Sequence, residues 1–278
     1  MDQLQIYKSN ALIEASYRLT PAEQRIMLCC ISKVRRDQVL TDDVMYKVSV
    51  ADYSKLAGTD SNSVYKEIAD AALRLKRREV WLHERPNGSG KHHRTLVTGW
   101  VQSIAYIKSE GYVELRFTKD MLPYLTQLTE QFTRYSLKDV ARMTSSHGIR
   151  LYELLCQWNS VGRREVSIEW MRELFQLEGK YPVLKDFKRR VIEVAVAQVN
   201  EHSPLWVSWE QRKTGRRVTH LIFIFGDKNN QEKKNTVKRE FLSTGSIYGI
   251  PNKIIEKKAY PGESYEDTAL RLLEESKG

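Results

Sequence analysis

The chain has 278 residues, and its 41% hydrophobic and 10% aromatic content beside 29% charged residues excludes a disordered protein. The length suffices for one large domain or two ordinary ones, each with its own core, and we expect two. The formal net charge of +10 indicates a polyanionic partner, nucleic acid before an acidic membrane, because neutralising phosphates releases counterions.

Membrane segments and cysteine chemistry are also constrained by the sequence. No stretch reaches the length of a transmembrane helix, and the first residues, MDQLQIYKSN, lack the basic and apolar regions of a signal peptide, so we expect a cytoplasmic protein. Cys29, Cys30 and Cys156 lie in apolar runs without a CxxC spacing. This pattern favours reduced core residues over a metal site or a disulfide framework.

In chain order, the first half predicts a helix, a short strand, two helices and a β-hairpin. The first helix covers RIMLCCISKVRR (25–36), and YKVSVADYSKLAG from Tyr46 predicts the strand and the second helix. SVYKEIADAALRLKRR from Ser63 predicts a longer helix, because its apolar residues recur every three or four positions. REVWLHE and RTLVTGWVQSIAY then predict a hairpin around the glycine-rich turn RPNGSGK.

The middle of the chain separates two similar halves. GYVELRFTKDMLPYLTQL predicts a strand followed by a short helix, outside either half. The serines and glycine of RYSLKDVARMTSSHG favour a domain boundary near residue 142. We expect LKDVARMTSSHGIRLYELL to open the second domain as two helices.

The second half repeats the pattern of the first at a spacing of roughly 120 residues, which indicates a duplicated domain. RLYELLCQWNSVGRR (150–164) repeats the first helix, and REVSIEWMRELFQLEG repeats the strand and helix, with Ser49 and Ser167 in matching positions. VLKDFKRRVIEVAVAQVN from Val183 predicts the longer helix. PLWVSWEQRK and RRVTHLIFIF predict a second hairpin, with its turn at Thr214 and Gly215.

The order helix, strand, helix, turn, helix and hairpin is that of the winged helix, a variant of the helix-turn-helix. We therefore predict an α+β fold: a tandem pair of winged-helix domains at residues 1–142 and 143–226, related by internal duplication. The alternative is two generic α+β domains that match by chance.

Residues 227–278 predict a polar linker and a short helical tail. The helix begins near Ser264, and its apolar stripe comprises Ala269, Leu270, Leu272 and Leu273. With ten Lys and Arg against nine Asp and Glu, the tail carries only +1 of the net charge of +10. The folded halves therefore carry the rest.

The helix YPVLKDFKRRVIEVAVAQVN changes character along its length. On a helical wheel Phe187, Val191, Val194 and Ala195 share one stripe, and Lys185, Lys188 and Arg189 lie on the opposite side. From Val191 to Val199 nearly every position is Val, Ile or Ala, so the latter part of the helix has no solvent face beyond Glu193, Gln198 and Asn200, and we expect it to be packed all round. A recognition helix needs this division, because its start enters the major groove and its end anchors it in the core.

Basic residues gather at both places where a winged helix touches DNA. Arginine pairs bidentately with guanine, so Arg189 or Arg190 suits base reading, whereas Lys185 and Lys188 suit phosphates. The predicted wing tip adds Arg212, Lys213, Arg216 and Arg217. The alternative for these residues is an ordinary solvated face.

The first half has a weaker version of the same face, suited to backbone contacts, and a solvated surface explains it almost as well. Its candidate DNA-binding residues are Lys66, Arg74, Lys76, Arg77 and Arg78 on or after the long helix, and Lys91 and Arg94 in the hairpin turn. His92 and His93 lie in the same turn.

Catalytic and cofactor motifs are missing from the sequence. There is no P-loop, dinucleotide-binding turn, HExxH or GxSxG motif. A rolling-circle nickase would need two histidines separated by one apolar residue, whereas His92 and His93 are adjacent. We expect a binding protein with no catalytic residues, no metal and no cofactor.

The segment YPVLKDFKRRVIEVAVAQVN, after SIEWMRELFQLEGK, resembles the second winged helix of iteron-binding plasmid replication initiators, the RepE and RepA-like family. The resemblance extends over residues 5–226 and includes NALIEASYRLTPAEQRIML. It implies two winged-helix domains that bind directly repeated origin sequences, the iterons, as a monomer. The recognition helix of the family maps onto Lys185, Lys188, Arg189 and Arg190, and the first domain contributes backbone contacts and a dimer interface.

The resemblance also implies the partners: double-stranded origin DNA, a homodimer in equilibrium with the monomer, and the host proteins DnaA and DnaB helicase. The dimer would repress its own gene at an operator inverted repeat. The protein would act in the bacterial cytoplasm, bound to plasmid DNA, without a membrane. Two other functions stay open at this point: a transcriptional repressor without an initiator role, and a metal-dependent nickase.

Overall fold

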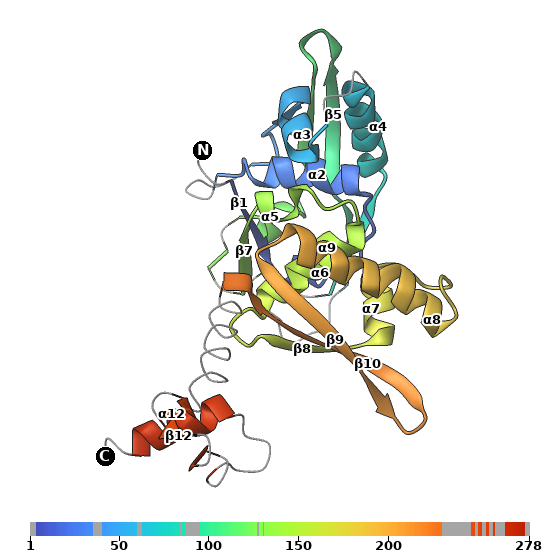
Figure 1. The fold of residues 1–278 in the computed structure, drawn as a ribbon. Helices are drawn as coiled ribbons and strands as arrows, with labels where there is room; N and C mark the ends of the chain where they lie inside the picture. The colour runs from blue at the N-terminus through green and yellow to red at the C-terminus, as the bar shows by residue number, and fades with distance from the viewer. Residues whose placement is uncertain are drawn as a thin grey trace. The chain divides into compact units, whose positions relative to one another are not determined.

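The structure is a computed structural model that describes residues 4–35, 41–59, 63–83, 85–86, 95–126, 128–129, 131–229, 246–247, 250–251, 254–255, 258 and 265–275. It divides into two compact units, the first ending at Phe225 and the second beginning at Gly226 (Figure 1). Helices and strands occur in both units, and the predicted α+β class is confirmed. Among the described residues no helix is both long and apolar enough to cross a membrane.

The first winged helix contains three helices and a three-stranded sheet. Its elements are α2 (Pro21–Ile31), β2 (Tyr46–Ser49), α3 (Val50–Ala57), α4 (Val64–Lys76), β5 (Val101–Ile107) and β6 (Tyr112–Phe117). The sheet has the order β2-β6-β5 with antiparallel pairs, and α2, α3 and α4 pack against one another. Sequence dictates where α2 begins, because Thr20 and Glu23 form a capping box and Pro21 fits the first helical position.

The hairpin predicted for the first half is wrong in part. β3 (Glu79–Leu82) does pair with β4 (Leu96–Gly99), but β5 follows β4 at once and pairs with β6 instead. The segment GYVELRF, expected to lie between the two repeated halves, therefore supplies the central strand of the first sheet. One run, residues 96–107, takes part in two hairpins, and the fully buried Trp100 lies at the junction between them. The turn equivalent to a wing is thus at Lys108–Gly111.

The second winged helix repeats this topology. Its elements are α6 (Ser146–Gln157), β8 (Arg163–Ser167), α7 (Ile168–Leu174), α8 (Leu184–Phe187), a π-helical turn (Lys188–Ile192), α9 (Glu193–His202), β9 (Leu205–Thr214) and β10 (Arg217–Asp227). The sheet order β8-β10-β9 matches β2-β6-β5 strand for strand. Ser49 and Ser167 do occupy equivalent positions, since each ends the first strand and caps the next helix with its hydroxyl. The predicted duplication is confirmed.

The two winged helices share one core and a polar joint. Between them lie β1 (Gln5–Ser9), α1 (Asn10–Ile13), η2 (Leu122–Tyr124), β7 (Phe132–Ser136) and α5 (Lys138–Ala141), with β1 paired to β7. The helix α6 contacts both β7 and α9. Lys8 of β1 and Glu153 of α6 form an ion pair of 2.6 Å, with side chains 5% and 1% exposed. Arg150 of α6 donates to the carbonyls of Ile13 and Ala15 at 3.1 and 2.8 Å.

His147, in α6 of this joint, gives the protein a pH dependence. Burial, reinforced by Arg18 and Arg150, lowers the pKa of His147 to about 4, and its ring packs on Phe175. An unfolded histidine titrates near pH ~6.5, so below that pH the unfolded state binds more protons. We expect the free energy of unfolding to fall as the pH drops from ~6.5 to ~4. Between pH ~6.5 and ~4, the free energy of unfolding measured by urea denaturation should fall more in the wild type than in His147→Gln. An equal fall in both proteins would contradict this.

The second unit contains a short hairpin and a helix. β11 (Ser246–Ile247) pairs with β12 (Ile250–Pro251), and α12 covers Tyr265–Glu275. The predicted tail helix is confirmed, but its stripe is narrower than expected: Ala269 and Leu272 are buried, whereas Leu270 is 46% exposed. Only part of the predicted linker falls within the described residues.

The three cysteines behave as predicted from their apolar neighbours. All three thiols are free, with Cys29 and Cys30 buried and Cys156 half-buried. Burial raises the pKa of Cys29 to about 11 and that of Cys156 to about 12. These thiols stay protonated near neutral pH and are poor nucleophiles.

Candidate nucleic-acid interface

The predicted recognition helix is one continuous helix from Leu184 to His202, with a π-helical turn inside it. Arg172 of α7 fixes the loop before it, because its guanidinium donates to the carbonyls of Lys180 and Tyr181, both at 2.7 Å. The same guanidinium lies 4.5 Å from the centre of the Phe187 ring. Arg172 therefore fixes both the loop before the helix and Phe187 in its first turn.

The π-helical turn changes which residues face the core. Its extra residue shifts the register, so that the buried set comprises Phe187, Val191, Ile192, Ala195 and Val199. The predicted stripe is wrong at Val194, which is 42% exposed. The expectation that the helix is packed all round beyond Val191 also fails, since Ala197 is exposed as well. A helical wheel assumes a constant 100° per residue and cannot represent the inserted residue.

The basic side chains at the helix start have different surroundings. Lys185, Arg189 and Arg190 are exposed, and Lys188 is half-buried. Arg189 forms an ion pair with Asp186 one turn earlier, at 3.1 Å. Among the described residues, Lys185 and Arg190 have no hydrogen-bond or ion-pair partner, so both can engage a ligand without breaking a contact.

The predicted wing lies beside this helix start. Residues 210–217, at the end of the β9–β10 hairpin, are all exposed. Lys188 donates to the Gln211 side chain at 3.1 Å, and its amine lies 6.0 Å from the centre of the Trp209 ring. Figure 1 shows α8 and the tip of this hairpin on the same side of the first unit. The two predicted basic clusters therefore lie next to each other, joined by the contact between Lys188 and Gln211.

The wing residues divide into one anchored and three unpaired side chains. Arg212 forms an ion pair with Glu165 of β8, and this hydrogen bond holds the pKa of Glu165 below its ordinary value. Lys213, Arg216 and Arg217 have neither a hydrogen-bond nor an ion-pair partner among the described residues, and Gly215 makes the turn with φ +62°. The wing tip thus carries exposed, unpaired positive charge on a defined hairpin.

The basic residues of the first domain are placed less favourably for binding DNA than those of the second domain. Lys66 is exposed in the first turn of α4, but Lys76 and Arg77 are exposed at the opposite end of the helix. Lys91 and Arg94, with His92 and His93, lie outside the described residues. The turn that corresponds to the second wing, Lys108–Gly111, was not among the predicted site residues.

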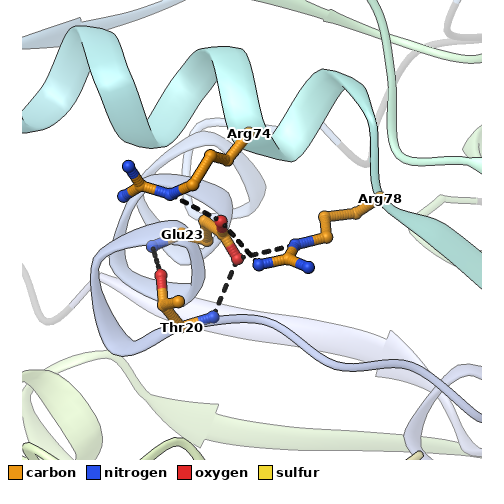
Figure 2. Close-up of polar contacts among 4 residues, drawn as sticks. All are labelled: Thr20, Glu23, Arg74 and Arg78. Carbon is orange, nitrogen blue, oxygen red and sulfur yellow. Dashed lines mark hydrogen bonds and ion pairs between the residues drawn. The ribbon is translucent and has the colours of Figure 1, made fainter.

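Arg74 and Arg78 have a structural partner that the sequence did not reveal. Both contact the fully buried carboxylate of Glu23 in α2, Arg74 through Nε at 3.1 Å and Arg78 through two nitrogens at 3.1 Å (Figure 2). The same carboxylate accepts the Thr20 backbone N–H at 2.8 Å. A buried charge requires such compensation, so these arginines hold α4 on α2, and a DNA contact by them remains only a prediction.

Several residues of this surface were not predicted from the sequence. Asp186, Glu165 and Gln211 each position a basic side chain of the surface. Asp186 has a sequence signal, since it stands three residues before Arg189 on a helix. Glu165 and Gln211 have none, because their partners are 47 and 23 residues away.

Within the described part of the chain, no group of three or more His, Cys, Asp or Glu residues could hold a metal ion. His83 is exposed, and His202 and His220 are half-buried. The arrangement of this surface suits binding to a polyanion.

Comparisons with known proteins agree with this geometry. The family model described as "Initiator Replication protein, WH1" matches residues 5–156, and "Initiator Rep protein, WH2" matches residues 167–225. An uncharacterized 27.6 kDa protein of Escherichia coli is 27% identical over 238 residues, covering 82% of this chain and 96% of that protein. A replication initiation protein of Escherichia coli is 25% identical, covering 89% of this chain and 81% of that protein.

A solved structure, the Pi initiator protein in complex with iteron DNA, has the same fold. It matches with a TM-score of 0.66 at 21% sequence identity, covering 81% of this chain and 98% of that chain. The likeness therefore extends over both winged helices and the elements between them.

Proposed function

The chain belongs to the initiator replication protein family, and from this premise we propose that it initiates plasmid DNA replication by binding directly repeated origin sequences. The observation that carries the proposal is that the basic helix start and the basic wing of the second domain lie next to each other, joined by the Lys188–Gln211 contact. A helix start and a wing that act together span a groove and its flanking phosphates. The Pi initiator, which shares the fold, is a protein solved with iteron DNA.

Within this proposal the basic residues have distinct tasks. Arg189 and Arg190 read bases in the major groove, because a guanidinium pairs bidentately with guanine. Lys185, Lys188 and the wing residues Arg212, Lys213, Arg216 and Arg217 neutralise phosphates. Lys66, Lys76 and Arg77 of the first domain add contacts to the DNA backbone.

We further propose that the protein acts without catalysis, as a scaffold that binds iterons, helps to open the adjacent duplex and recruits host DnaA and DnaB. A dimer, formed through the first domain, would repress the gene of the protein at an inverted repeat, whose two-fold symmetry matches that of a dimer. The proposed domain limits are residues 1–142 and 143–226, with 227–278 as a separate tail.

The deciding experiment for the function is a footprint on the plasmid that encodes the protein. We expect protection of several direct repeats at the origin, spaced by whole helical turns. Protection of a lone palindrome, with normal plasmid replication after deletion of the gene, would favour a repressor without an initiator role. Relaxation of the supercoiled plasmid by purified protein with magnesium or manganese would show a nickase and contradict the proposal.

For the interface residues, we expect Arg189→Ala and Arg190→Ala each to weaken binding to the specific repeat by about 1–3 kcal/mol while changing nonspecific binding little. Lys185→Ala should weaken binding to all sequences alike and reduce the salt slope by about one unit. Fluorescence anisotropy over a salt series measures both quantities. Arg134→Ala, an exposed arginine of β7, is the matched control. Unchanged affinity in all three interface variants would contradict the assignment.

A further inference from the structure

The strand β8 has a free edge. Among the strands of the described residues, with the sheet order β8-β10-β9, it pairs on one side only. The Phe225 N–H donates to the Gly162 carbonyl at 2.9 Å, and the antiparallel register continues with Phe223 opposite Arg164. Because bonded residues alternate in an antiparallel pair, Arg164 and Val166 bond to β10, and the backbone groups of Arg163 and Glu165 point away from it.

This edge opens into a groove of about 630 Å³. The groove is lined by all of β8, Arg163 to Ser167, and by Glu14, Trp158, Val161 and Trp170. Trp158 and Val161 are 41% and 60% exposed, so apolar surface flanks the free backbone groups. Unpaired edge groups beside exposed apolar side chains form a template for another strand.

The floor of the groove is rigid. The Arg164 guanidinium donates to Glu14 at 2.6 Å, to the Leu154 carbonyl at 2.9 Å and to the Gln157 side chain at 2.7 Å. It lies 5.6 and 5.4 Å from the ring centres of Trp158 and Trp170. An incoming strand therefore meets a preformed surface and orders few side chains.

The charges along the edge select the partner. Within one copy, Arg163 and Glu165 form an ion pair of 3.2 Å, and Glu165 also pairs with Arg212. If a second β8 adds in antiparallel fashion about a two-fold axis at Arg164, Arg163 of each copy also lies opposite Glu165 of the other, so the ion pairs of the two copies join. Arg163 and Glu165 are also the residues with outward backbone groups, so hydrogen bonding and charge favour the same register. An axis at Arg163 or Glu165 would instead place like charges opposite each other, which is destabilising.

We propose that β8 pairs with β8 of a second copy of this chain and joins the two three-stranded sheets into one six-stranded sheet. The helix start of the candidate DNA surface stays accessible in this arrangement, because Lys188 contacts β9 at the other edge of the sheet, whereas Arg212 of the wing reaches Glu165 on the β8 edge. The pairing goes beyond the proposed function and differs from a dimer formed through the first domain. A five-residue edge buries far less than the roughly 1,200 Å² of stable interfaces, so the association is weak and transient.

Charge reversal tests the pairing in the full-length protein. Arg163→Glu makes both positions with outward backbone groups, 163 and 165, acidic, and Glu165→Arg makes both basic. Each variant alone should weaken self-association by about tenfold or more, because two symmetric attractive pairs become repulsive. An equimolar mixture of the two should restore it, because an acidic edge then meets a basic one. Sedimentation velocity over a concentration series measures the association.

Two further variants make the result decisive. Arg163→Pro removes an outward N–H and should abolish the association, whereas Arg134→Glu, with the same charge change on an exposed strand residue of β7, should leave it intact. Thermal unfolding confirms that each variant folds.

The proposal is overturned if the wild type sediments like Arg163→Pro at every concentration, or if the mixture associates no more than its components. A dimer through the first domain would persist in all variants, and failure of the proposed function would appear separately, as wild-type protein that protects no origin repeat.

Discussion

The double variant Arg74→Ala/Arg78→Ala should lower the free energy of unfolding by about 3–5 kcal/mol at neutral pH. The Glu23 side chain is fully buried, and these two arginines supply its only charged partners among the described residues (Figure 2). With both removed, the carboxylate keeps the Thr20 N–H but remains an uncompensated charge in the core. Urea denaturation followed by circular dichroism measures the loss.

The control for this experiment is Glu23→Gln in the same double-variant background. Removing the unpaired charge should recover much of the lost free energy of unfolding, because burying an amide costs far less free energy than burying an unpaired carboxylate. The outcome also separates two roles for these arginines. If Arg74 and Arg78 serve only to bind DNA, the double variant would lose DNA affinity at unchanged stability, and the structural assignment would be wrong.

Lys8→Met should destabilise the protein by a similar amount, about 3–5 kcal/mol, through the joint between the two winged helices. Burial by itself lowers the pKa of Lys8, but Glu153 and Tyr17 together more than offset this, so the pKa of Lys8 is raised and the amine stays charged. Without the amine, Glu153 keeps the Tyr135 hydroxyl as a neutral donor at 2.5 Å. The loss should appear as a lower midpoint in urea denaturation, with one transition for both domains, because they share a core.

The matched variant is Lys8→Met/Glu153→Gln, in which both charges of the pair are gone. It should be more stable than Lys8→Met alone, because removing both members of a buried pair costs less than stranding one. Lys138→Met, an exposed lysine of α5, controls for the loss of a positive charge at the surface. Equal stability of Lys8→Met and Lys138→Met would show that the buried pair contributes nothing.

Local patterns predicted much of the fold because the relevant physics is local. The capping residues Ser49 and Ser167 mark helix starts within three residues of their partners, and the apolar spacing of α4 and α6 follows from one helix turn. The basic helix start and the basic wing were also predicted, since each is a short run of the sequence. What could not be predicted was the contact that joins them, Lys188 to Gln211.

Strand pairing in the first domain shows why the rest of the fold could not be predicted from the sequence. The segments RTLVTG, VQSIAYI and YVELRF all alternate as strands do, and a glycine-rich turn favoured the wrong neighbour for the second of them. Register and pairing depend on which faces become buried, which only the assembled sheet decides. The same holds for the helix register after Lys188, where the π-helical turn exposes Val194, which the helical wheel placed in the buried stripe, and buries Ile192, which it did not.

The sequence by itself determined the duplicated order of elements, the cap positions, the basic runs and the resemblance to the initiator family, all of which depend on residues close together in the chain. Only the tertiary structure decided which basic residues face solvent and which compensate a buried charge. Arg190 and Arg78 look alike in sequence, yet Arg190 is exposed without a partner while Arg78 holds Glu23 from 55 residues away. Whether an arginine meets water or a buried carboxylate depends on long-range packing, because burial sets the cost of leaving a charge unpaired.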